Sequence, residues 1–220
     1  MRKLNRTSVA IPACLSTQTN GRRYSELHGA EKNEIRDRLL EMQKERCAYC
    51  ERRTGRERDD GHVEHFRNQS GHSHLDLEWA NLFWSCQDEK TCGKHKDKCN
   101  MVAGTGRQRA FVASDLIDPT VDDPDEFLLF VSDGTVTPRP GLAAAKEHRA
   151  RETLRVFQIA DSPYLRKARQ DAVSPHIVAI DTLLPHGVEV VKGYVQTVIA
   201  KIESVPFSTA VKHYLGGLLS

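Results

Sequence analysis

Apolar residues recur at helical spacing near the start of the chain, between residues 31 and 46. They stand at positions i, i+4 and i+7, with charged residues filling most of the positions between them: Ile35, Leu39 and Met42. This pattern is typical of an amphipathic helix that buries one stripe of side chains. We therefore predict a helix here that ends near Arg46, where a cysteine motif begins.

The residues before this helix, 1–30, show no sustained period and include Pro12, Gly21 and several serines and threonines. We predict an extended arm that packs in part through Val9, Ile11 and Leu15.

The second half of the chain changes from a strand pattern to a helical one. Ser132-Asp133-Gly134 separates the apolar run 127–131 from a Thr-Val-Thr segment, which predicts a short hairpin. After Pro140 we predict helices over residues 143–160, from Asp161-Ser162-Pro163 onward, over 188–203 and over 206–215.

Composition narrows the class of protein. The chain has 220 residues, 32 Lys and Arg against 30 Asp and Glu, and six cysteines. No apolar stretch approaches the roughly 20 residues that a membrane helix requires, and the N-terminus lacks the apolar segment of a secretory signal. We expect a cytoplasmic protein without membrane association, whose cysteines are thiols or metal ligands rather than disulfides.

The cysteines form two pairs. Cys47 and Cys50 make a CxxC motif, and Cys86 and Cys92 follow after an interval of 35 residues. Two such pairs can surround one structural Zn²⁺ with four thiolates. Cys99 could replace Cys92 as a ligand. The alternatives are four unrelated buried cysteines or a redox CxxC, although the βαβ context of a redox motif is missing.

Between the two pairs lies the segment Gly61-His62-Val63-Glu64-His65-Phe66, followed by Asn81. With a Glu-His pair first and an asparagine after it, both between two cysteine pairs, the sequence resembles the HNH nucleases. A closer resemblance is to the HNH endonucleases of retron-associated and Septu (PtuB-like) anti-phage defence. It covers residues 1–100 and rests on CAYCERR, VEHFR, LEWANLFWSC and CGKHK.

We predict an α+β fold, in which the resemblance implies a zinc-stabilised ββα-metal (HNH) module, and the residue pattern predicts an N-terminal helix and a mostly α-helical C-terminal region. The corresponding regions are an arm and helix at 1–45, the module at 46–105, and an acidic linker, hairpin and helices at 106–220. The resemblance also implies that the protein hydrolyses phosphodiesters with the help of Mg²⁺ or Mn²⁺. His65 would be the general base and Glu64 a ligand of the catalytic ion, while Asn81 would either ligate that ion or orient the base.

The sequence departs from the family pattern after the last zinc cysteine. The family often has a metal-binding histidine there and a lysine three residues later, whereas this chain has Gly93, with Lys96 at the lysine position. Either His95 takes the ligand role from a shifted register, or Glu64 and Asn81 hold the ion with water in the remaining positions. His62, two residues before Glu64 on the same face of a strand, is a second candidate ligand.

Basic residues near these motifs would contact phosphates, although neighbouring acidic residues are equally compatible with a solvated charged loop. They are Arg52, Arg53, Arg56, Arg58, Arg67, Lys94, Lys96 and Lys98. Trp79 and Trp84 are expected in the core of the module.

For partners, the resemblance implies a PtuA-like ATPase, nucleic acid with DNA favoured over RNA or tRNA, and a retron reverse transcriptase with its RNA/DNA hybrid. The alternative is a zinc-stabilised adaptor that binds the ATPase without catalysis. We expect the helices after residue 140 to contribute the ATPase-docking surface.

Overall fold

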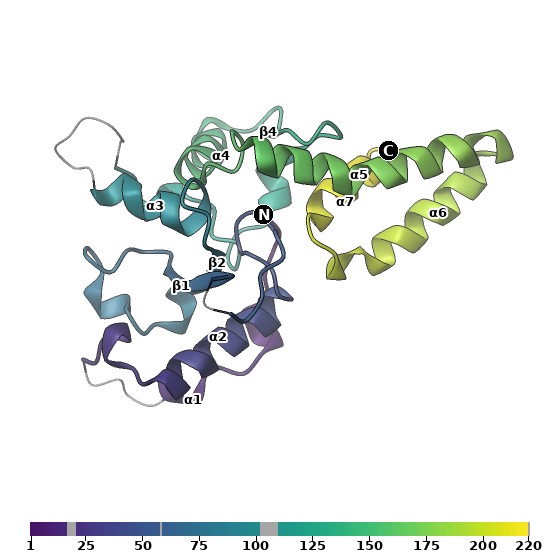
Figure 1. Cartoon of the computed structure of the whole chain (residues 1–220). Coiled ribbons are helices and arrows are strands. Elements are labelled where there is room, and N and C mark those ends of the chain that lie inside the picture. Colours follow the sequence, from purple (N-terminus) through teal and green to yellow (C-terminus); the bar gives the residue numbers. More distant parts are fainter. Residues whose placement is uncertain (17–20, 58, 102–109, 220) are drawn as a thin grey trace.

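The computed structural model describes residues 1–16, 21–57, 59–101 and 110–219. The fold is α+β, with two small antiparallel sheets among helices, and a helical pair projects from the rest of the chain (Figure 1). The main elements are α1 (Ala13–Ser16), α2 (Gly29–Gln43), β1 (Gly61–His65), β2 (Leu82–Cys86), α3 (Cys92–Met101), β3 (Leu128–Phe130), β4 (Val136–Pro138), α4 (Ala144–Phe157), α5 (Pro163–Leu183), α6 (Val188–Lys201) and α7 (Ser208–Gly216).

Helix α2 is the amphipathic helix expected from the periodicity. The Glu31 carboxylate accepts a hydrogen bond from the His28 backbone N–H at 2.8 Å and so caps the first turn. Lys44 ends the helix in the left-handed conformation. At this end the Gln43 amide donates to the Trp84 carbonyl at 2.8 Å and accepts from the Trp84 N–H at 2.8 Å, which fixes α2 against β2.

Strands β1 and β2 pair antiparallel from Gly61 opposite Cys86 to His65 opposite Leu82. Every residue of β2 is buried, and α3 packs against this strand. A hairpin followed by a helix therefore carries all the sequence motifs after the CxxC.

The N-terminal arm packs in part through two of the three residues that we expected, and mainly through others. Ile11 is 54% exposed, so its predicted packing role is wrong. Val9 and Leu15 are partly buried against the core, whereas the fully buried apolar residues of the arm are Met1, Leu4 and Leu27. The arm alternates extended backbone with short helical turns, and this irregularity leaves no period from which its buried side could be identified.

The C-terminal elements follow the predicted pattern. β3 and β4 form the hairpin. Gly134 in its turn has φ +82°, and a Cβ there would lie 2.0 Å from the Arg166 carbonyl oxygen, so the turn requires glycine. Helix α5 begins at Pro163, and the Ser162 hydroxyl accepts from the Leu165 N–H at 3.3 Å.

The described residues from 110 onward share the core of the cysteine-bearing module. Phe157 of α4 stacks on Tyr49 of the CxxC motif, with ring centroids 4.0 Å apart. In the acidic stretch before the hairpin, Leu116 and Ile117 are buried, so this stretch is packed structure. The expected boundary at 105/106 lies outside the described residues.

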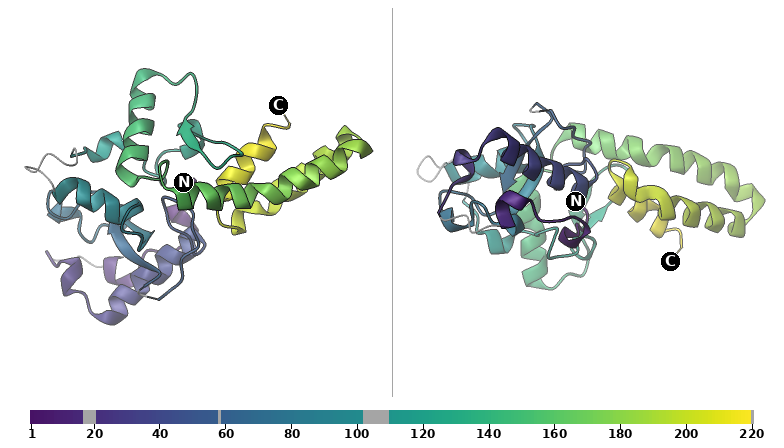
Figure 2. Two further views of the ribbon diagram at one scale, coloured as in Figure 1. Left: turned by 45° about the horizontal axis from the view of Figure 1, so that its top comes forward. Right: turned by 90° about the horizontal axis from the view of Figure 1, so that it is seen from below.

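Helix α5 extends away from the body, α6 runs back beside it, and α7 begins near the body (Figures 1 and 2). At the returning end, Arg46 donates to the Val205 carbonyl at 2.6 Å, and Glu51 accepts from the Thr209 N–H at 3.1 Å. The segment between α6 and α7 and the start of α7 are thereby bonded to the residues directly before and after the CxxC motif. Within the described ranges, no helix is both long and apolar enough to cross a membrane.

Candidate active site and metal centre

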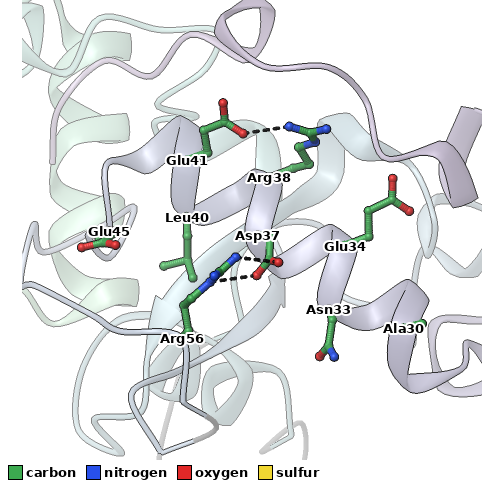
Figure 3. Close-up of a pocket in the computed structure, with 9 residues that line it drawn as sticks. All are labelled: Ala30, Asn33, Glu34, Asp37, Arg38, Leu40, Glu41, Glu45 and Arg56. Atoms are coloured by element: carbon green, nitrogen blue, oxygen red, sulfur yellow. Dashed lines mark hydrogen bonds and ion pairs between the residues drawn. The ribbon is translucent and has the colours of Figure 1, made fainter.

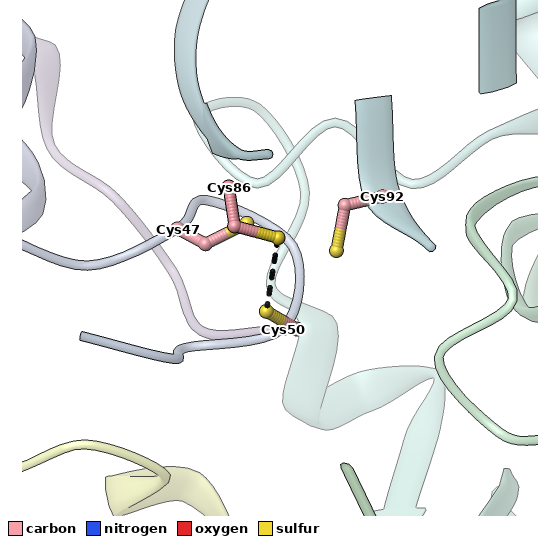
Figure 4. A group of neighbouring side chains, drawn as sticks. All are labelled: Cys47, Cys50, Cys86 and Cys92. Carbon is pink, nitrogen blue, oxygen red and sulfur yellow. Dashed lines mark hydrogen bonds between the residues drawn. The ribbon is translucent and has the colours of Figure 1, made fainter. Parts of the chain in front are cut away.

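The four paired cysteines converge on one point. The sulfurs of Cys47, Cys50, Cys86 and Cys92 lie within 4.8 Å of one another, and all four residues are buried. Cys50 and Cys86 are 3.9 Å apart between sulfurs, and Cys92 points into the group from the start of α3 (Figure 4). A tetrahedral zinc with Zn–S bonds of about 2.3 Å requires sulfurs about 3.8 Å apart. The residues therefore fit a structural Zn²⁺, as the spacing predicted.

The electrostatics of the cluster also favour a cation. Burial raises the pKa of the Cys92 thiol well above its usual value, and the neighbouring sulfurs raise it further. Several thiolates could not share this space unless a positive ion compensated them. Cys99, the alternative ligand, instead lies along α3 with its sulfur 3.8 Å from His95 Nδ1, so Cys92 completes the cluster.

Glu64 lies in the middle of a buried ion pair. Its Oε1 is 2.6 Å from Lys96 Nζ, and both side chains are at most 1% exposed. Burial by itself raises the pKa of Glu64, but Lys96 and His62 outweigh that effect and the pKa lies below its usual value. Burial lowers the pKa of Lys96, and Glu64 with Asp97 raises it above its usual value. The carboxylate is therefore charged and is held in place from α3.

His62 faces the other oxygen of the same carboxylate. It stands two residues before Glu64 on β1, hence on the same face of the strand, and its Nε2 is 3.5 Å from Glu64 Oε2. Both ring nitrogens are buried, and neither makes a hydrogen bond within the described chain. Buried polar atoms without partners are uncommon and call for a ligand.

Gly93 makes room for this pair of side chains. A Cβ at Gly93 would lie 2.5 Å from Glu64 Oε2 and 3.0 Å from His62 Nε2. The family pattern often has a histidine at the position of Gly93. In this chain Glu64 and His62 fill the space that such a side chain would need. The carboxylate oxygen and the imidazole nitrogen, 3.5 Å apart, are both groups that can ligate a divalent cation.

His65, the expected general base, is held by the loop that follows β1. Its Nε2 lies 2.9 Å from the Asp76 carbonyl oxygen and 3.0 Å from Asp76 Oδ1. Tyr24 meets its ring edge-on, with centroids 5.5 Å apart. Burial lowers the pKa of His65, although Asp76 partly offsets this. Burial thus favours the neutral imidazole.

Along a regular strand, successive side chains point to opposite faces. His65 is the last residue of β1, and its contacts lie toward Asp76 and Tyr24, whereas those of Glu64 lie toward α3. Lys96 links the Glu64 side chain to the backbone of His65, because its Nζ also donates to the His65 carbonyl at 2.7 Å.

Asn81 binds the backbone of the loop between the two strands. Its Oδ1 accepts from the Arg67 N–H at 2.7 Å, and its Nδ2 donates to the carbonyls of Arg67 at 3.0 Å and Leu75 at 3.1 Å. Its amide oxygen is therefore used within the loop. Of the two roles expected for Asn81, these contacts support positioning, because they hold the segment that ends at Asp76.

His95 is placed on a different side of α3 from Gly93. Its Nδ1 lies 2.8 Å from the Val156 carbonyl oxygen of α4. The structure thus brings His62, and not His95, to Glu64. Sequence reasoning missed Asp76 and Tyr24, the two residues that contact His65. An acidic residue in a loop and a tyrosine in the arm carry no local signal of such a role.

The basic residues near the motifs are largely engaged with acidic ones. Arg56 is 2.6 Å from Asp37, and Lys98 is 2.7 Å from Glu89. Longer ion pairs join Arg52 to Asp88 and Arg53 to Glu45. Arg58 lies outside the described residues. Trp79 and Trp84 are buried in the core, as expected.

Comparison with known proteins gives two curated relatives, while no protein-family model matches the chain. The retron Vc95 putative HNH endonuclease of Vibrio cholerae serotype O1 biovar El Tor is 27% identical over 146 residues, 63% of this chain and 63% of that protein. The Septu protein PtuB of Bacillus thuringiensis is 33% identical over 90 residues, 41% of this chain and 30% of that protein. The chain thus spans less than two thirds of the length of either relative. The resemblance to Septu PtuB and retron HNH proteins that the motifs indicated is confirmed.

Proposed function

We propose that the chain is a metal-dependent HNH endonuclease, an effector subunit of an anti-phage defence complex, and that β1, β2 and α3 form a ββα-metal module. The observation that carries the proposal is the approach of His62 Nε2 to within 3.5 Å of Glu64 Oε2 on one face of β1, beside Gly93, where a Cβ would collide with both atoms. The name of the retron relative supports the same activity.

In this proposal Glu64 and His62 hold a divalent ion, which when bound stabilises the negative charge that builds up on the phosphate. Both acceptors beside His65 Nε2 are oxygens of Asp76. The hydrogen-bond network therefore assigns the proton to Nε2 and leaves the lone pair on Nδ1. Nδ1 takes a proton from the attacking water, and Asn81 keeps the supporting loop in position.

The test is cleavage of supercoiled plasmid, of single strands and of tRNA by the full chain, with Mg²⁺, Mn²⁺ or EDTA. His65→Ala is expected to reduce cleavage by about 10²- to 10⁴-fold, because a general base acts in the transition state. Zinc content and the unfolding temperature should stay close to wild type. His74→Ala, an exposed histidine of the same loop, is the matched control. Normal cleavage by His65→Ala would contradict the assignment.

One observation favours the adaptor as a second candidate. Lys96 already neutralises Glu64, which weakens the attraction of that carboxylate for a further cation. If the chain is an adaptor, the plasmid should stay intact with either divalent ion, whether or not the ATPase is present.

We further propose that a PtuA-like ATPase docks on the projecting α5–α6 pair. Leu184 is 53% exposed and Val188 64% exposed where the two helices meet, and Val178 of α5 is 64% exposed. Truncation after Pro140 would also remove Phe157, which stacks on the CxxC motif, so substitution is the cleaner experiment.

Leu184→Glu with Val188→Glu should abolish copurification with the ATPase and leave zinc content and unfolding unchanged, because both side chains are exposed. The matched control is Lys192→Glu on the solvent side of α6. If the variant still copurified with the ATPase as well as wild type does, the docking surface would have to lie on another part of the chain. The same purification tests for a retron reverse transcriptase with its RNA/DNA hybrid.

A further inference from the structure

Helix α2 separates two grooves of opposite charge. The groove between α2 and β1 has a volume of about 620 Å³. Lys32 and Arg36 of α2, His62 of β1 and Lys94 of α3 line it, and none of its described lining residues carries a carboxylate. The remaining lining residues are Tyr24, Gly29, Asn33, Gly61, Val63, Trp84 and Gln87.

The groove on the other flank of α2 has a volume of about 720 Å³ and is mainly acidic (Figure 3). Its two arginines are both paired: Arg38 lies 2.9 Å from Glu41, and Arg56 lies 2.6 Å from Asp37. Four of its lining residues are carboxylates: Glu34, Asp37, Glu41 and Glu45. One helix thus presents cations toward β1 and carboxylates away from it.

The cations of the first groove, which we name the α2–β1 groove, have weaker acidic partners. Arg36 is 3.5 Å from Asp37, and Lys94 is 3.9 Å from Glu89. Lys32 donates to the Ser25 carbonyl at 3.2 Å and lies over the Tyr24 ring. At these longer distances an incoming anion can displace the existing partners at little cost.

The α2–β1 groove also leads directly to the proposed metal site, because His62 belongs to both. Trp84, which lines the same groove, carries a buried indole N–H that has no hydrogen-bond partner in the described chain. The groove thus combines positive charge and unused donors with a position next to the reacting centre.

We propose that the phosphodiester backbone of the substrate lies in the α2–β1 groove, and that Lys32 and Arg36 bind phosphates next to the one that is cleaved. The inference rests on the proposed nuclease function and extends the binding surface to α2, outside the HNH motifs. Contacts of this kind attract nucleic acid without regard to sequence. They weaken as the salt concentration rises, because the counterions that binding releases then gain less entropy.

The experiment measures binding of a fluorescent 24-base-pair DNA duplex in EDTA, with the full chain carrying His65→Ala so that cleavage is prevented. Lys32→Ala with Arg36→Ala is added to this background. The matched control is Arg38→Ala with Arg56→Ala, which removes two positive charges from the opposite flank. Kd is measured from 50 to 200 mM salt, and the duplex is then replaced by its single strand and by an RNA of the same sequence.

Loss of Lys32 and Arg36 should raise Kd by about tenfold or more at low salt and reduce the slope of log Kd against log salt by about 2. The control should bind like the parent. The groove assignment would be overturned if both double variants bound the duplex as tightly as the His65→Ala parent, or if both lost the same amount of affinity. Failure of the nuclease proposal would appear separately, as the absence of cleavage by the wild-type chain in Mg²⁺ and Mn²⁺.

Discussion

The cysteine cluster, which fits a structural metal ion, and the Glu64–His62 pair, which we propose as the site of the catalytic ion, are built in opposite ways. The cysteine cluster offers four sulfurs, all buried and all from the protein. The Glu64–His62 cluster offers one oxygen and one nitrogen beside a groove. A closed set of four soft ligands suits a structural zinc, whereas a site with few protein ligands leaves positions for water and substrate. The difference teaches that ligand count and closure, more than proximity, separate a structural site from a catalytic one.

The first turn of α3 serves both clusters. Cys92, with φ +56°, directs its sulfur to the cysteine cluster, and the next residue, Gly93, leaves space for Glu64 and His62. Lys96, one turn later on the same face of the helix, anchors Glu64. Adjacent residues therefore support different sites, so single substitutions can separate the two.

The largest effect is expected at the closed cluster. Cys47→Ser should lose zinc and cooperative unfolding together, because binding free energy on the order of 10 kcal/mol is also folding free energy at such a site. Elemental analysis and thermal unfolding by circular dichroism measure both. Cys14→Ser, a cysteine of the arm outside the cluster, is the control and should keep the metal. Folded, zinc-free wild-type protein would contradict this prediction.

An intermediate effect is expected when the buried ion pair is broken. Glu64→Gln should lose cleavage and cost about 3–5 kcal/mol in the free energy of unfolding, because Lys96 is left charged and buried. Removing Glu64 therefore costs stability, which distinguishes it from removing His65. The double variant with Lys96→Met should recover most of this stability without cleavage, as measured by urea unfolding. A single variant as stable as wild type would show that the pair is not charged.

The smallest effect is expected from a single methyl group between the two clusters. Gly93→Ala places Cβ against Glu64 Oε2 and His62 Nε2, and overpacking of this kind costs about 1–3 kcal/mol. We expect weaker Mn²⁺ binding in calorimetry and unchanged zinc content, although Cys92 is the neighbouring residue. Gly193→Ala, where a Cβ meets nothing within 4 Å, is the control. If Gly93→Ala lost zinc as well as Mn²⁺ binding, the two clusters would not be independent and this prediction would be wrong.

Some of this could be predicted from the sequence because the signals are local. The period of Ile35, Leu39 and Met42 predicted α2, and the turn at Gly134 predicted the β3–β4 hairpin. The two cysteine pairs predicted the cluster, because thiols at these spacings have few other uses in a chain without disulfides. The packing of the arm carried no comparable period, and Ile11 was wrongly expected to be buried.

By itself, then, the sequence determined which residue types were present for each kind of chemistry, together with α2, the β3–β4 hairpin and the C-terminal helices. Only the tertiary structure decided which of those residues meet. Gly93 and Lys96 face Glu64 while His95 faces Val156. That choice depends on where α3 begins and how it is rotated against β1. The physical reason is that helix phase and strand face follow from packing between segments distant in sequence, whereas periodicity and ligand spacing are properties of each segment alone.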